Sequence, residues 1–250
     1  MSPLVTLLTD FGTADGYVAE MKGVLLTLAP QVRLVDASHE LPPQDVEYAR
    51  LALARYWRRF PVGTIHVVVV DPGVGSARRA IAVASDGRLL VGPDNGVLSP
   101  ALLLPGARAV TLPTPAGASA TFHGRDLFAP AAARLAAGAT LEALGDPCDD
   151  PIVRRTPEAH RLDDGAVLGE VIAVDRFGNL ITNLLTTRGG TVEIAGERLA
   201  VRRTYADVAP GALLALVGSS GLLEVALREG SAARRLGVGR GAAVRLLPPG

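Results

Sequence analysis

Short apolar runs alternate with segments of helical periodicity in the first half of the chain. Residues 4–9, 32–35 and 64–70 are apolar runs of strand length, and an aspartate follows each of them. Between them, residues 17–28 and 45–58 repeat apolar side chains at intervals of three and four, as one face of an α-helix does. Further strands are expected at residues 80–84, 88–91 and 107–112, with a helix at 127–137. This βαβαβ order predicts an α/β domain of Rossmann-like type, with a mainly parallel sheet and right-handed crossovers.

The second half of the chain has a different pattern. Its apolar segments are short, separated by glycine or polar turns, and no long helical repeat lies between them: 169–174, 191–194, 199–203, 212–217, 223–227 and 243–247. A small all-β barrel or sandwich fits this pattern best. We therefore expect an α/β domain at residues 1–155, a proline- and charge-rich linker at 156–164, and a β-barrel-like domain at 165–250.

Composition narrows the classes of function. The 25 basic residues are balanced by 25 acidic ones, so a broad basic face for nucleic acid is not expected. The single cysteine, Cys148, excludes an intrachain disulfide. Residues 1–4 have no basic segment ahead of an apolar core, and no apolar run approaches the length of a membrane span. We expect a cytoplasmic protein whose partners include neither nucleic acid nor membrane.

The three aspartates that end the predicted parallel strands are candidates for ligand contact. Asp10, Asp36 and Asp71 would all lie at the carboxyl edge of the sheet, which is where open α/β sheets bind their ligands. Aspartate also starts turns and caps helices at such positions, so for each residue taken alone a structural role is the preferred interpretation.

The segment after Asp71 carries more information. Asp71-Pro72-Gly73-Val74-Gly75 is a glycine-bearing loop with a carboxylate at one end and Arg78 and Arg79 at the other. It lacks the Gly-Lys-Ser/Thr ending of a Walker loop, and the turn after the first strand does not match the dinucleotide fingerprint. We expect Arg79 to be a solvated side chain at a strand start.

A histidine at a helix entry completes the set of candidates. His123 lies between Phe122 and Gly124, directly ahead of the predicted helix at 127–137, and is well placed to face a cleft. The other three histidines, His39, His66 and His160, are expected to have structural roles. No two histidines have zinc-ligand spacing, so neither a metal site nor another cofactor is expected.

These motifs together resemble the S-adenosylmethionine hydroxide adenosyltransferases, the adenosine-forming S-adenosylmethionine hydrolases related to the fluorinating and chlorinating enzymes. The matching segments run in order through the chain: Leu8-Thr9-Asp10-Phe11-Gly12 with Asp15 and residues 17–23, Val35-Asp36 with His39, residues 69–75 with Arg78 and Arg79, Gly92-Pro93-Asp94-Asn95-Gly96, Phe122-His123-Gly124-Arg125-Asp126, and Asp175-Arg176-Phe177-Gly178-Asn179-Leu180 with Thr182 and Asn183. The resemblance implies a hydrolase that attacks ribose C5′ of S-adenosyl-L-methionine with water, releasing adenosine and L-methionine.

The resemblance also implies roles for single residues. The catalytic set falls on Asp71, Arg78 and His123, in the first domain. The residues implied in substrate binding lie in both domains: Asp10 and Asp15 at the ribose, Asp175 at the methionine amine, Asn179 at the adenine, Phe177 lining the pocket, Tyr205 stacking on adenine, Ser219 and Ser220 at the methionine carboxylate, Ala232 as a backbone contact to adenine, and Glu224, which fits the hydrolase pattern. Ser231 stands where the family pattern leads us to expect asparagine. The family further implies a homotrimer, with sites between the first domain of one subunit and the second domain of its neighbour.

Three alternatives remain open from the sequence. A halogenase would need neutral donors and apolar walls around a halide, which the carboxylate of Asp71 would repel. Halogenases of this kind have an aromatic residue at the counterpart of Asp71, and the fluorinating branch carries a long insertion for which this chain has no room after Arg79. A sensor that binds adenosine or S-adenosylmethionine without catalysis could be built on the same two domains. A phosphohydrolase could use Asp10, Asp36 and Asp71 to hold a metal.

Overall fold

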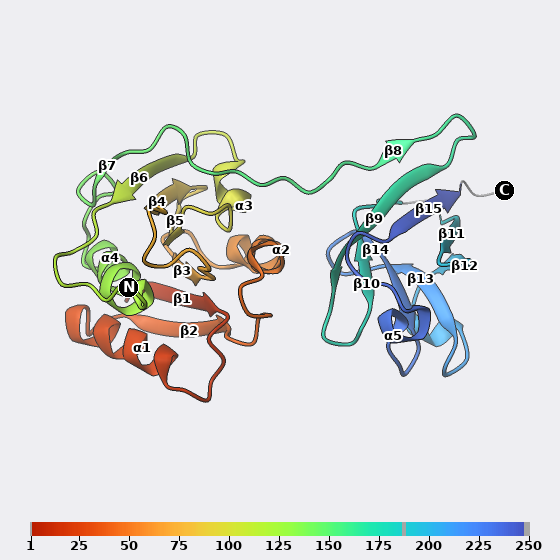
Figure 1. The fold of residues 1–250 in the computed structure, drawn as a ribbon, viewed down its shortest axis with the longest axis horizontal. Coiled ribbons are helices and arrows are strands. Elements are labelled where there is room, and N and C mark those ends of the chain that lie inside the picture. Colours follow the sequence, from red (N-terminus) through yellow and green to blue (C-terminus); the bar gives the residue numbers. More distant parts are fainter. Residues whose placement is uncertain (1, 187–188, 248–250) are drawn as a thin grey trace. The chain divides into compact units, whose positions relative to one another are not determined.

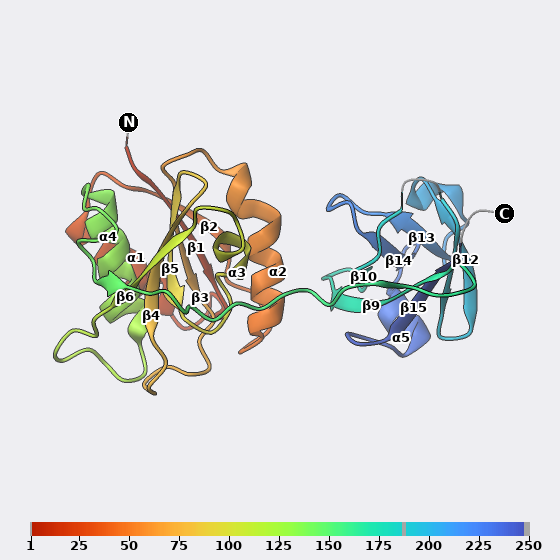
Figure 2. The ribbon, with the colours of Figure 1, turned by 90° about the horizontal axis from the view of Figure 1, so that it is seen from above.

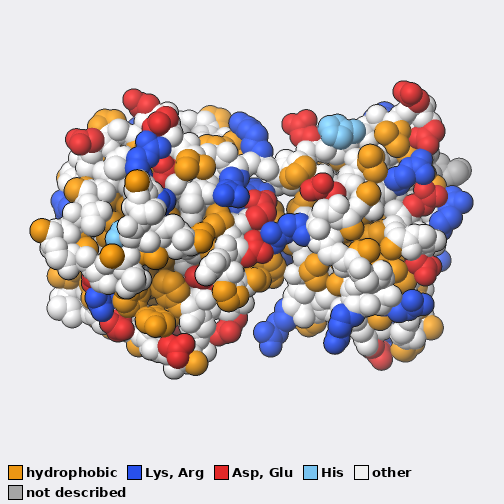
Figure 3. Space-filling model, in the orientation of Figure 1, with side chains coloured by type: hydrophobic (Ala, Val, Ile, Leu, Met, Phe, Trp, Pro, Cys, Tyr) orange, Lys and Arg blue, Asp and Glu red, His pale blue; other side chains and the backbone are white. Residues whose placement is uncertain are grey.

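The chain divides between Arg155 and Thr156 into two compact units, and each is described here by itself. The computed structural model describes residues 2–186 and 189–247 (Figure 1). Within these residues no helix is long and apolar enough to cross a bilayer. Figure 3 shows acidic and basic side chains interspersed on the visible face of each unit, as the balanced net charge leads one to expect.

The first unit is a sheet covered by helices on both faces. Within the described residues the sheet has seven strands in the order β2-β1-β3-β5-β4-β6-β7. Their bounds are β1 Leu4–Thr9, β2 Arg33–Ser38, β3 Ile65–Val69, β4 Ala80–Ser85, β5 Arg88–Pro93, β6 Arg108–Leu112 and β7 Asp146–Pro147. Helices α1 (Tyr17–Leu28) and α4 (Ala129–Ala136) cover one face, while α2 (Val46–Tyr56) and α3 (Ser99–Leu102) cover the other (Figure 2). A separate apolar core fills each face.

The helix boundaries follow from local chemistry. The Asp45 side chain caps α2 by accepting the backbone N–H of Tyr48 at 2.9 Å, and the helix continues as one 3₁₀ turn, Trp57–Arg59. The helix expected at 127–137 is α4, and a π-helical turn, Gly124–Phe128, precedes it directly. Such turns are rare and concentrate at functional sites.

The prediction of a mainly parallel sheet is wrong, because the sheet is mixed. Strands β2, β1, β3 and β5 are parallel, whereas β4 is antiparallel to both of its neighbours, β5 and β6. The physical reason is the connection between β4 and β5, which consists of Asp86 and Gly87 alone, with φ of 49° and 69°. Two residues with positive φ form a tight hairpin, and a parallel pair would need a crossover of a dozen or more residues.

The reversal of β4 decides where its connections lie. Because β4 is antiparallel to β5, it begins at the edge of the sheet where β3 and β5 end. Strand β6 is antiparallel to β4 and therefore also ends at that edge. The segments that follow β1, β3, β5 and β6, and the one that precedes β4, thus meet along one edge of the sheet.

The second unit is a closed β-barrel, which confirms the barrel rather than the sandwich. Within the described residues the strand order is β10-β14-β13-β12-β11-β15-β9, and the pairing of β9 with β10 closes the ring of seven. The bounds are β8 His160–Arg161, β9 Val167–Val174, β10 Leu180–Thr182, β11 Thr191–Ile194, β12 Glu197–Arg202, β13 Leu213–Val217, β14 Leu223–Leu227 and β15 Ala243–Leu247. A 3₁₀ turn, Tyr205–Asp207, and a short helix, α5 (Ala232–Leu236), complete the unit, and β8 pairs with β9 outside the ring.

Candidate active site

Asp71, Arg78 and His123 meet at the sheet edge where β3 ends and β4 begins. Nε of Arg78 donates to Oδ1 of Asp71 at 3.1 Å, and Nη2 of Arg78 donates to Oδ2, so the pair is bidentate. The two side chains are only 8% and 5% exposed. His123, at the entry to the π-helical turn, is buried as well. The three residues implied as catalytic by the sequence are therefore brought together, with Arg78 in contact with both of the others.

The guanidinium of Arg78 is held on every side. Nη2 lies 3.1 Å from Nδ1 of His123, and Nη1 donates to the carbonyl of Arg79 at 3.0 Å. The guanidinium carbon lies 5.6 Å from the ring centroid of Phe128, which is fully buried. A planar cation with contacts in its plane and an aromatic ring over its face has little freedom to turn.

The contact between Arg78 and His123 fixes the tautomer of the imidazole. A guanidinium can only donate hydrogen bonds, so Nδ1 of His123 must accept. The neutral ring then carries its proton on Nε2. His123 is therefore a hydrogen-bond donor at Nε2, and Asp71 is the member of the set with the character of a base.

The environment adjusts Asp71 for that role. Burial raises the pKa of Asp71 above its ordinary value, and the charge and hydrogen bonds of Arg78 offset only part of this rise. The bidentate pairing of Asp71 with Arg78 is that of an ionised carboxylate, and burial gives this carboxylate a greater proton affinity than an exposed aspartate has. Each of its oxygens accepts one bond from Arg78, and the backbone N–H of Gly73 gives the carboxylate a further hydrogen bond. Acceptor capacity for one more donor remains.

Gly75 allows the loop after β3 to approach the His123 segment. Its φ is +76°, and a Cβ added there would lie 2.3 Å from the carbonyl oxygen of Ala120. A side chain at this position would force the two segments apart, and Arg78 could then no longer reach His123.

Asp10 lies in the segment after β1, which is tied to the segment after β2. Oδ2 of Asp10 accepts the backbone N–H of Gln44 at 2.6 Å, and Gly12 donates its N–H to the carbonyl of His39 at 2.8 Å. The His39 ring is buried and bonds to Thr9 Oγ1 at 2.9 Å. These bonds hold the Asp10 loop in place, which agrees with the structural role expected of His39. The contribution of Gln44 was not indicated by the sequence pattern.

Asp36 was expected to follow a strand, but it lies inside β2, which continues to Ser38 because Asp36 still pairs with Leu7 of β1. Its carboxylate contacts a histidine and a lysine. Its two oxygens bond to Nε2 of His39 at 2.9 Å and Nζ of Lys22 at 2.6 Å. Burial alone would raise the pKa of Asp36, but these hydrogen bonds and charges together lower it. Within the described residues, no group of three or more His, Cys, Asp or Glu side chains is arranged to hold a metal ion.

An aromatic cluster joins the Asp10 loop to the His123 segment. Phe11 packs edge-to-face on Phe122 with ring centroids 5.9 Å apart, and Tyr17 packs on Phe122 at 5.4 Å. Asp10 and His123, the neighbours of these phenylalanines in sequence, therefore belong to one region of the first unit. Asp15 is exposed in the loop before α1, and in the described chain no hydrogen bond or ion pair joins it to the other candidates.

In the second unit, Asp175, Asn179 and Tyr205 form one hydrogen-bonded group. Oδ1 of Asp175 accepts the backbone N–H groups of Phe177 and Asn179, both at 2.9 Å, and Oδ2 accepts Nδ2 of Asn179 at 3.0 Å. Nδ2 of Asn179 also lies 3.4 Å from the Tyr205 hydroxyl. Burial, followed by the negative charges of Glu224 and Asp175, raises the pKa of Tyr205, which keeps its hydroxyl protonated.

The remaining candidates of the second unit surround this group. Glu224, in β14, is buried, and a side chain at Gly218 would collide with its carboxylate. Ser219 and Ser220 are exposed in the turn that follows Gly218.

Ala232, the buried first residue of α5, lies beside the 175–179 turn. Ala233 donates its N–H to the carbonyl of Gly178 at 2.9 Å, and a Cβ at Gly178 would lie 2.0 Å from Oγ of Ser231. Phe177, in the same turn, is 76% exposed. The barrel thus gathers its predicted site residues at one place, including an exposed aromatic side chain.

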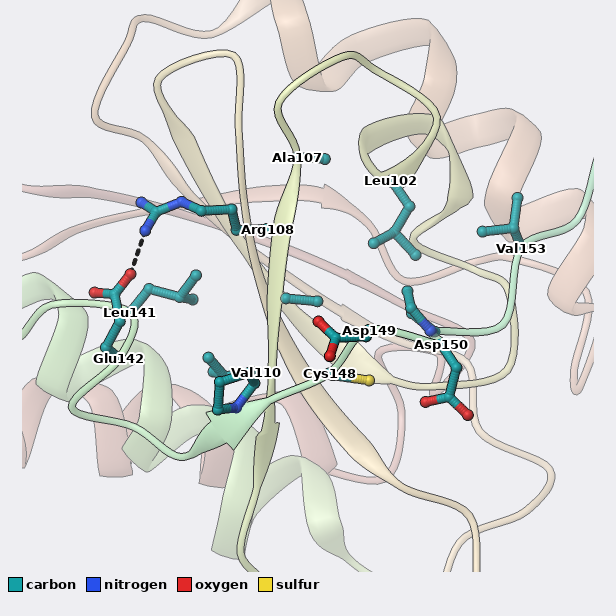
Figure 4. Close-up of a pocket in the computed structure, with 13 residues that line it drawn as sticks. Leu102, Ala107, Arg108, Val110, Leu141, Glu142, Cys148, Asp149, Asp150 and Val153 are labelled. Carbon is teal, nitrogen blue, oxygen red and sulfur yellow. Dashed lines mark hydrogen bonds and ion pairs between the residues drawn. The ribbon is translucent and has the colours of Figure 1, made fainter.

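A cleft of about 630 Å³ lies elsewhere on the first unit, beside β6 and residues 147–153 (Figure 4). Its wall combines apolar side chains such as Leu102 and Leu141 with the Arg108–Glu142 ion pair. Asp71, Arg78 and His123 are not among its lining residues. The polar cluster, and not this cleft, is therefore the candidate active site.

Comparison with known proteins agrees with the motif pattern. Residues 5–145 match the SAM hydroxide adenosyltransferase N-terminal domain, and residues 169–245 match the C-terminal domain of the same family. The (R)-S-adenosyl-L-methionine hydrolase of Thermus thermophilus is 48% identical, over 97% of this chain and 99% of the relative. A fluorinase from an Actinoplanes species is 31% identical, over 74% of this chain and 73% of its own.

A solved structure extends the likeness to the fold. An uncharacterised conserved protein from Thermotoga maritima superposes with a TM-score of 0.88 at 32% identity, covering 98% of this chain and 100% of its own. These matches confirm the resemblance drawn from the motifs. The chain belongs to the S-adenosylmethionine hydroxide adenosyltransferase family.

Proposed function

We propose that this protein hydrolyses S-adenosyl-L-methionine to adenosine and L-methionine, with Asp71, Arg78 and His123 as its catalytic residues. The observation that carries the proposal is a guanidinium that pairs with a buried carboxylate of raised pKa and also contacts an imidazole nitrogen. The names of the similar hydrolases support the same reaction.

The reaction needs an oxygen nucleophile and no acid for the leaving group. Oxygen of water bonds to C5′ while the C5′–S bond breaks, and its electron pair passes to sulfur, giving a neutral thioether. Asp71 accepts a proton from the attacking water, so that one proton is released overall. Arg78 and Nε2–H of His123 stabilise the hydroxide-like oxygen as it forms. Because a sulfonium cation and a hydroxide partly cancel their charges in the transition state, a site shielded from bulk water favours the reaction.

The substrate-binding roles form the second part of the proposal. Asp10 accepts hydrogen bonds from the ribose hydroxyls, with help from Asp15. In the barrel, Asp175 binds the methionine amine, Asn179 and the backbone at Ala232 bind adenine, and Tyr205 stacks on its ring. Phe177 lines the pocket, Ser219 and Ser220 bind the methionine carboxylate, and Glu224 holds Tyr205 and the turn at Gly218 in place. The exposure of Phe177 and Tyr205 supports these roles, since large apolar side chains at a surface mark binding sites.

The subunit arrangement is the third part. We expect a homotrimer whose sites combine the first unit of one subunit with the second unit of its neighbour, acting in the cytoplasm. Light scattering coupled to size exclusion should give three times the mass of 25.8 kDa. Mixing an Asp71→Asn chain with an Asn179→Ala chain should restore part of the activity if the two units of one site come from different subunits.

A halogenase is the nearest alternative, and the charge at the site argues against it. Both oxygens of Asp71 pair with Arg78, and a carboxylate beside this cation would repel a halide. A sensor without catalysis would need no buried base, whereas here burial raises the pKa of Asp71.

Isotope labelling separates these functions in one experiment. Incubation with S-adenosylmethionine in ¹⁸O-water should give methionine and adenosine labelled at the 5′ oxygen. The R and S sulfonium epimers are tested separately, and we expect the R form to react faster because similar hydrolases are named for it. Parallel reactions with chloride and fluoride should give no 5′-halogenated nucleoside. Unlabelled adenosine, a halogenated product or tight binding without turnover would each contradict the proposal.

A further inference from the structure

We propose that Arg79 and Asp94 form a positioning pair that fixes the guanidinium of Arg78 and fastens residues 150–152 to the same place. The inference rests on the proposed catalytic role of Arg78. It assigns a function to Arg79, which the sequence led us to expect as a solvated side chain.

The backbone of Arg79 is part of the site. Its carbonyl oxygen accepts two hydrogen bonds, one from Nη1 of Arg78 at 3.0 Å and one from the backbone N–H of Asp94 at 2.8 Å. The other nitrogens of Arg78 contact Asp71 and His123. The Arg79 carbonyl is thus the anchor that sets how the guanidinium of Arg78 lies in its own plane, and Asp94 holds that anchor.

The side chains of Arg79 and Asp94 hold the same two backbone segments together. Asp94 is 1% exposed at its side chain, and its Oδ2 accepts Nε of Arg79 at 2.9 Å. Strands β4 and β5 pair up to Ala80 and Pro93, so Arg79 and Asp94 are the first residues beyond the ladder. Beyond this point the β4–β5 ladder no longer holds the two backbone segments together. An ion pair between Arg79 and the buried carboxylate of Asp94 keeps the carbonyl of Arg79 in register with Asp94.

The pair also binds a segment distant in sequence. Nη1 of Arg79 donates to Oδ1 of Asp150 at 2.6 Å, and Nη2 donates to the Asp150 carbonyl at 2.8 Å. Oδ1 of Asp94 accepts the backbone N–H of Ile152 at 2.7 Å. Both oxygens of the buried Asp94 carboxylate are therefore used, one by the strand-end arginine and one by the segment that ends the first unit.

An arginine suits this position better than any other cation. Four contacts converge on one guanidinium: two to Oδ2 of Asp94, one to Oδ1 of Asp150 and one to the backbone carbonyl of Asp150. A lysine ammonium keeps the charge but lacks the fork geometry. Substituting lysine should therefore separate the effect of geometry from the effect of charge.

The test uses four variants of the full chain: Arg79→Lys, Arg79→Gln, Asp94→Asn and the double variant Arg79→Gln/Asp94→Asn. The double variant matters because removing one partner alone leaves a buried charge uncompensated, which can prevent folding. Arg108→Gln is the matched control, since Arg108 forms an exposed ion pair with Glu142 on the same unit. Each variant is assayed for kcat, KM, adenosine Kd, Tm and the pH dependence of kcat.

The expected result is a loss of turnover without a loss of binding. In Arg79→Lys and in the double variant, kcat should fall about tenfold, as misplacement of a catalytic group does, while adenosine Kd stays near the wild-type value. Arg78 lowers the pKa of Asp71, so loosening Arg78 should raise it and move the acid limb of the kcat profile upward by about half a pH unit. The Arg108→Gln control should match wild type in all five measurements.

Two results would overturn the inference. A folded Arg79→Lys and double variant with wild-type kcat and pH profile, whatever their Tm, would show that the pair only stabilises the fold. Equal losses in kcat and in adenosine binding would show a general disturbance of the site. The proposed hydrolase function fails separately, when wild-type protein gives no labelled adenosine. Full turnover in Arg78→Lys would instead remove the catalytic role of Arg78 on which this inference rests.

Discussion

Nη2 of Arg78 lies 3.1 Å from Nδ1 of His123, and this contact assigns the proton of the imidazole. An arginine that donates to Nδ1 leaves only Nε2 to carry the hydrogen. The same guanidinium bonds both oxygens of Asp71, so one cation sets the orientation of both candidate proton carriers. The three side chains consequently act as one unit, and changes to them should be strongly non-additive.

Replacing the base should remove turnover and leave binding in place. In Asp71→Asn the amide keeps the volume of the carboxylate but cannot accept a proton from water, so kcat should fall by about 10²-fold or more. Adenosine Kd, measured by calorimetry, should change little because the nucleoside product needs no base. A rise in Kd that matches the loss in kcat would reassign Asp71 to binding.

The tautomer of His123 makes two amide substitutions unequal. Glutamine can place an N–H near the position of Nε2, whereas asparagine reaches only the position of Nδ1. We expect His123→Gln to retain more turnover than His123→Asn, by about tenfold, if donation from Nε2 stabilises the attacking oxygen. Equal rates in the two variants, with equal Tm, would argue that His123 serves only to hold Arg78.

The raised pKa of Asp71 predicts the acid side of the pH profile. Burial, the larger influence, outweighs Arg78 and raises the pKa of Asp71 above 3.8. The base works only when it is ionised, so kcat should fall as pH drops through this raised pKa, at higher pH than an exposed aspartate would give. In Asp71→Asn the residual rate should lose this limb, and persistence of the limb would point to another base.

A buried histidine outside the site makes stability depend on pH. Burial, aided by the charge of Arg88, lowers the pKa of His66 from 6.5 to about 4. Unfolding therefore takes up a proton between these values, so the stabilisation is complete above pH 6.5 and is lost as pH falls toward 4, by up to about 3 kcal/mol. The free energy of unfolding can be measured in urea at pH 7 and pH 4.5, for wild type and for His66→Asn. The variant should lose less stability between the two pH values than the wild type does. The single tryptophan, Trp57, packs on His66 with ring centroids 6.3 Å apart and reports the transition, and identical pH dependence would exclude His66 as its source.

The role of Tyr205 can be divided into stacking and hydrogen bonding. Tyr205→Phe keeps the ring and loses only the 3.4 Å contact with Asn179, so adenosine Kd should hardly change. Tyr205→Leu removes the aromatic face, and Kd should rise about tenfold, as loss of one base–aromatic stack does. If both variants bind adenosine equally well, the ring does not contact adenine.

Local periodicity predicted most strands and helices. It did not predict the direction of β4, which depends on a two-residue hairpin turn rather than on periodicity. Asp86-Gly87 between two apolar runs is a hairpin signature, and it outweighs the βαβ order of the preceding segments. Strand β10, three residues long, was too short to register as a strand, yet it closes the barrel.

The proposed catalytic set could be named from its motifs because each motif is local, whereas the residues that contact it could not. Arg79 reaches Asp150, 71 positions away, and His39 reaches Thr9 across two strands. No pattern along the chain indicates which partners such polar side chains find, since the fold alone brings them together. The same holds for Tyr205 and Glu224, which barrel closure places near Asp175.

The antiparallel course of β4 has a consequence for how this family could diversify. The connection from Val70 to Arg79 starts and finishes at one rim of the sheet, so its length is independent of the strand pairings. Closing a longer loop between fixed ends costs little, about 0.6 kcal/mol for each doubling. Insertions or substitutions in this loop can therefore change which nucleophile the site holds, while the sheet stays intact. New reactions on the same substrate would accordingly arise at this rim of the sheet.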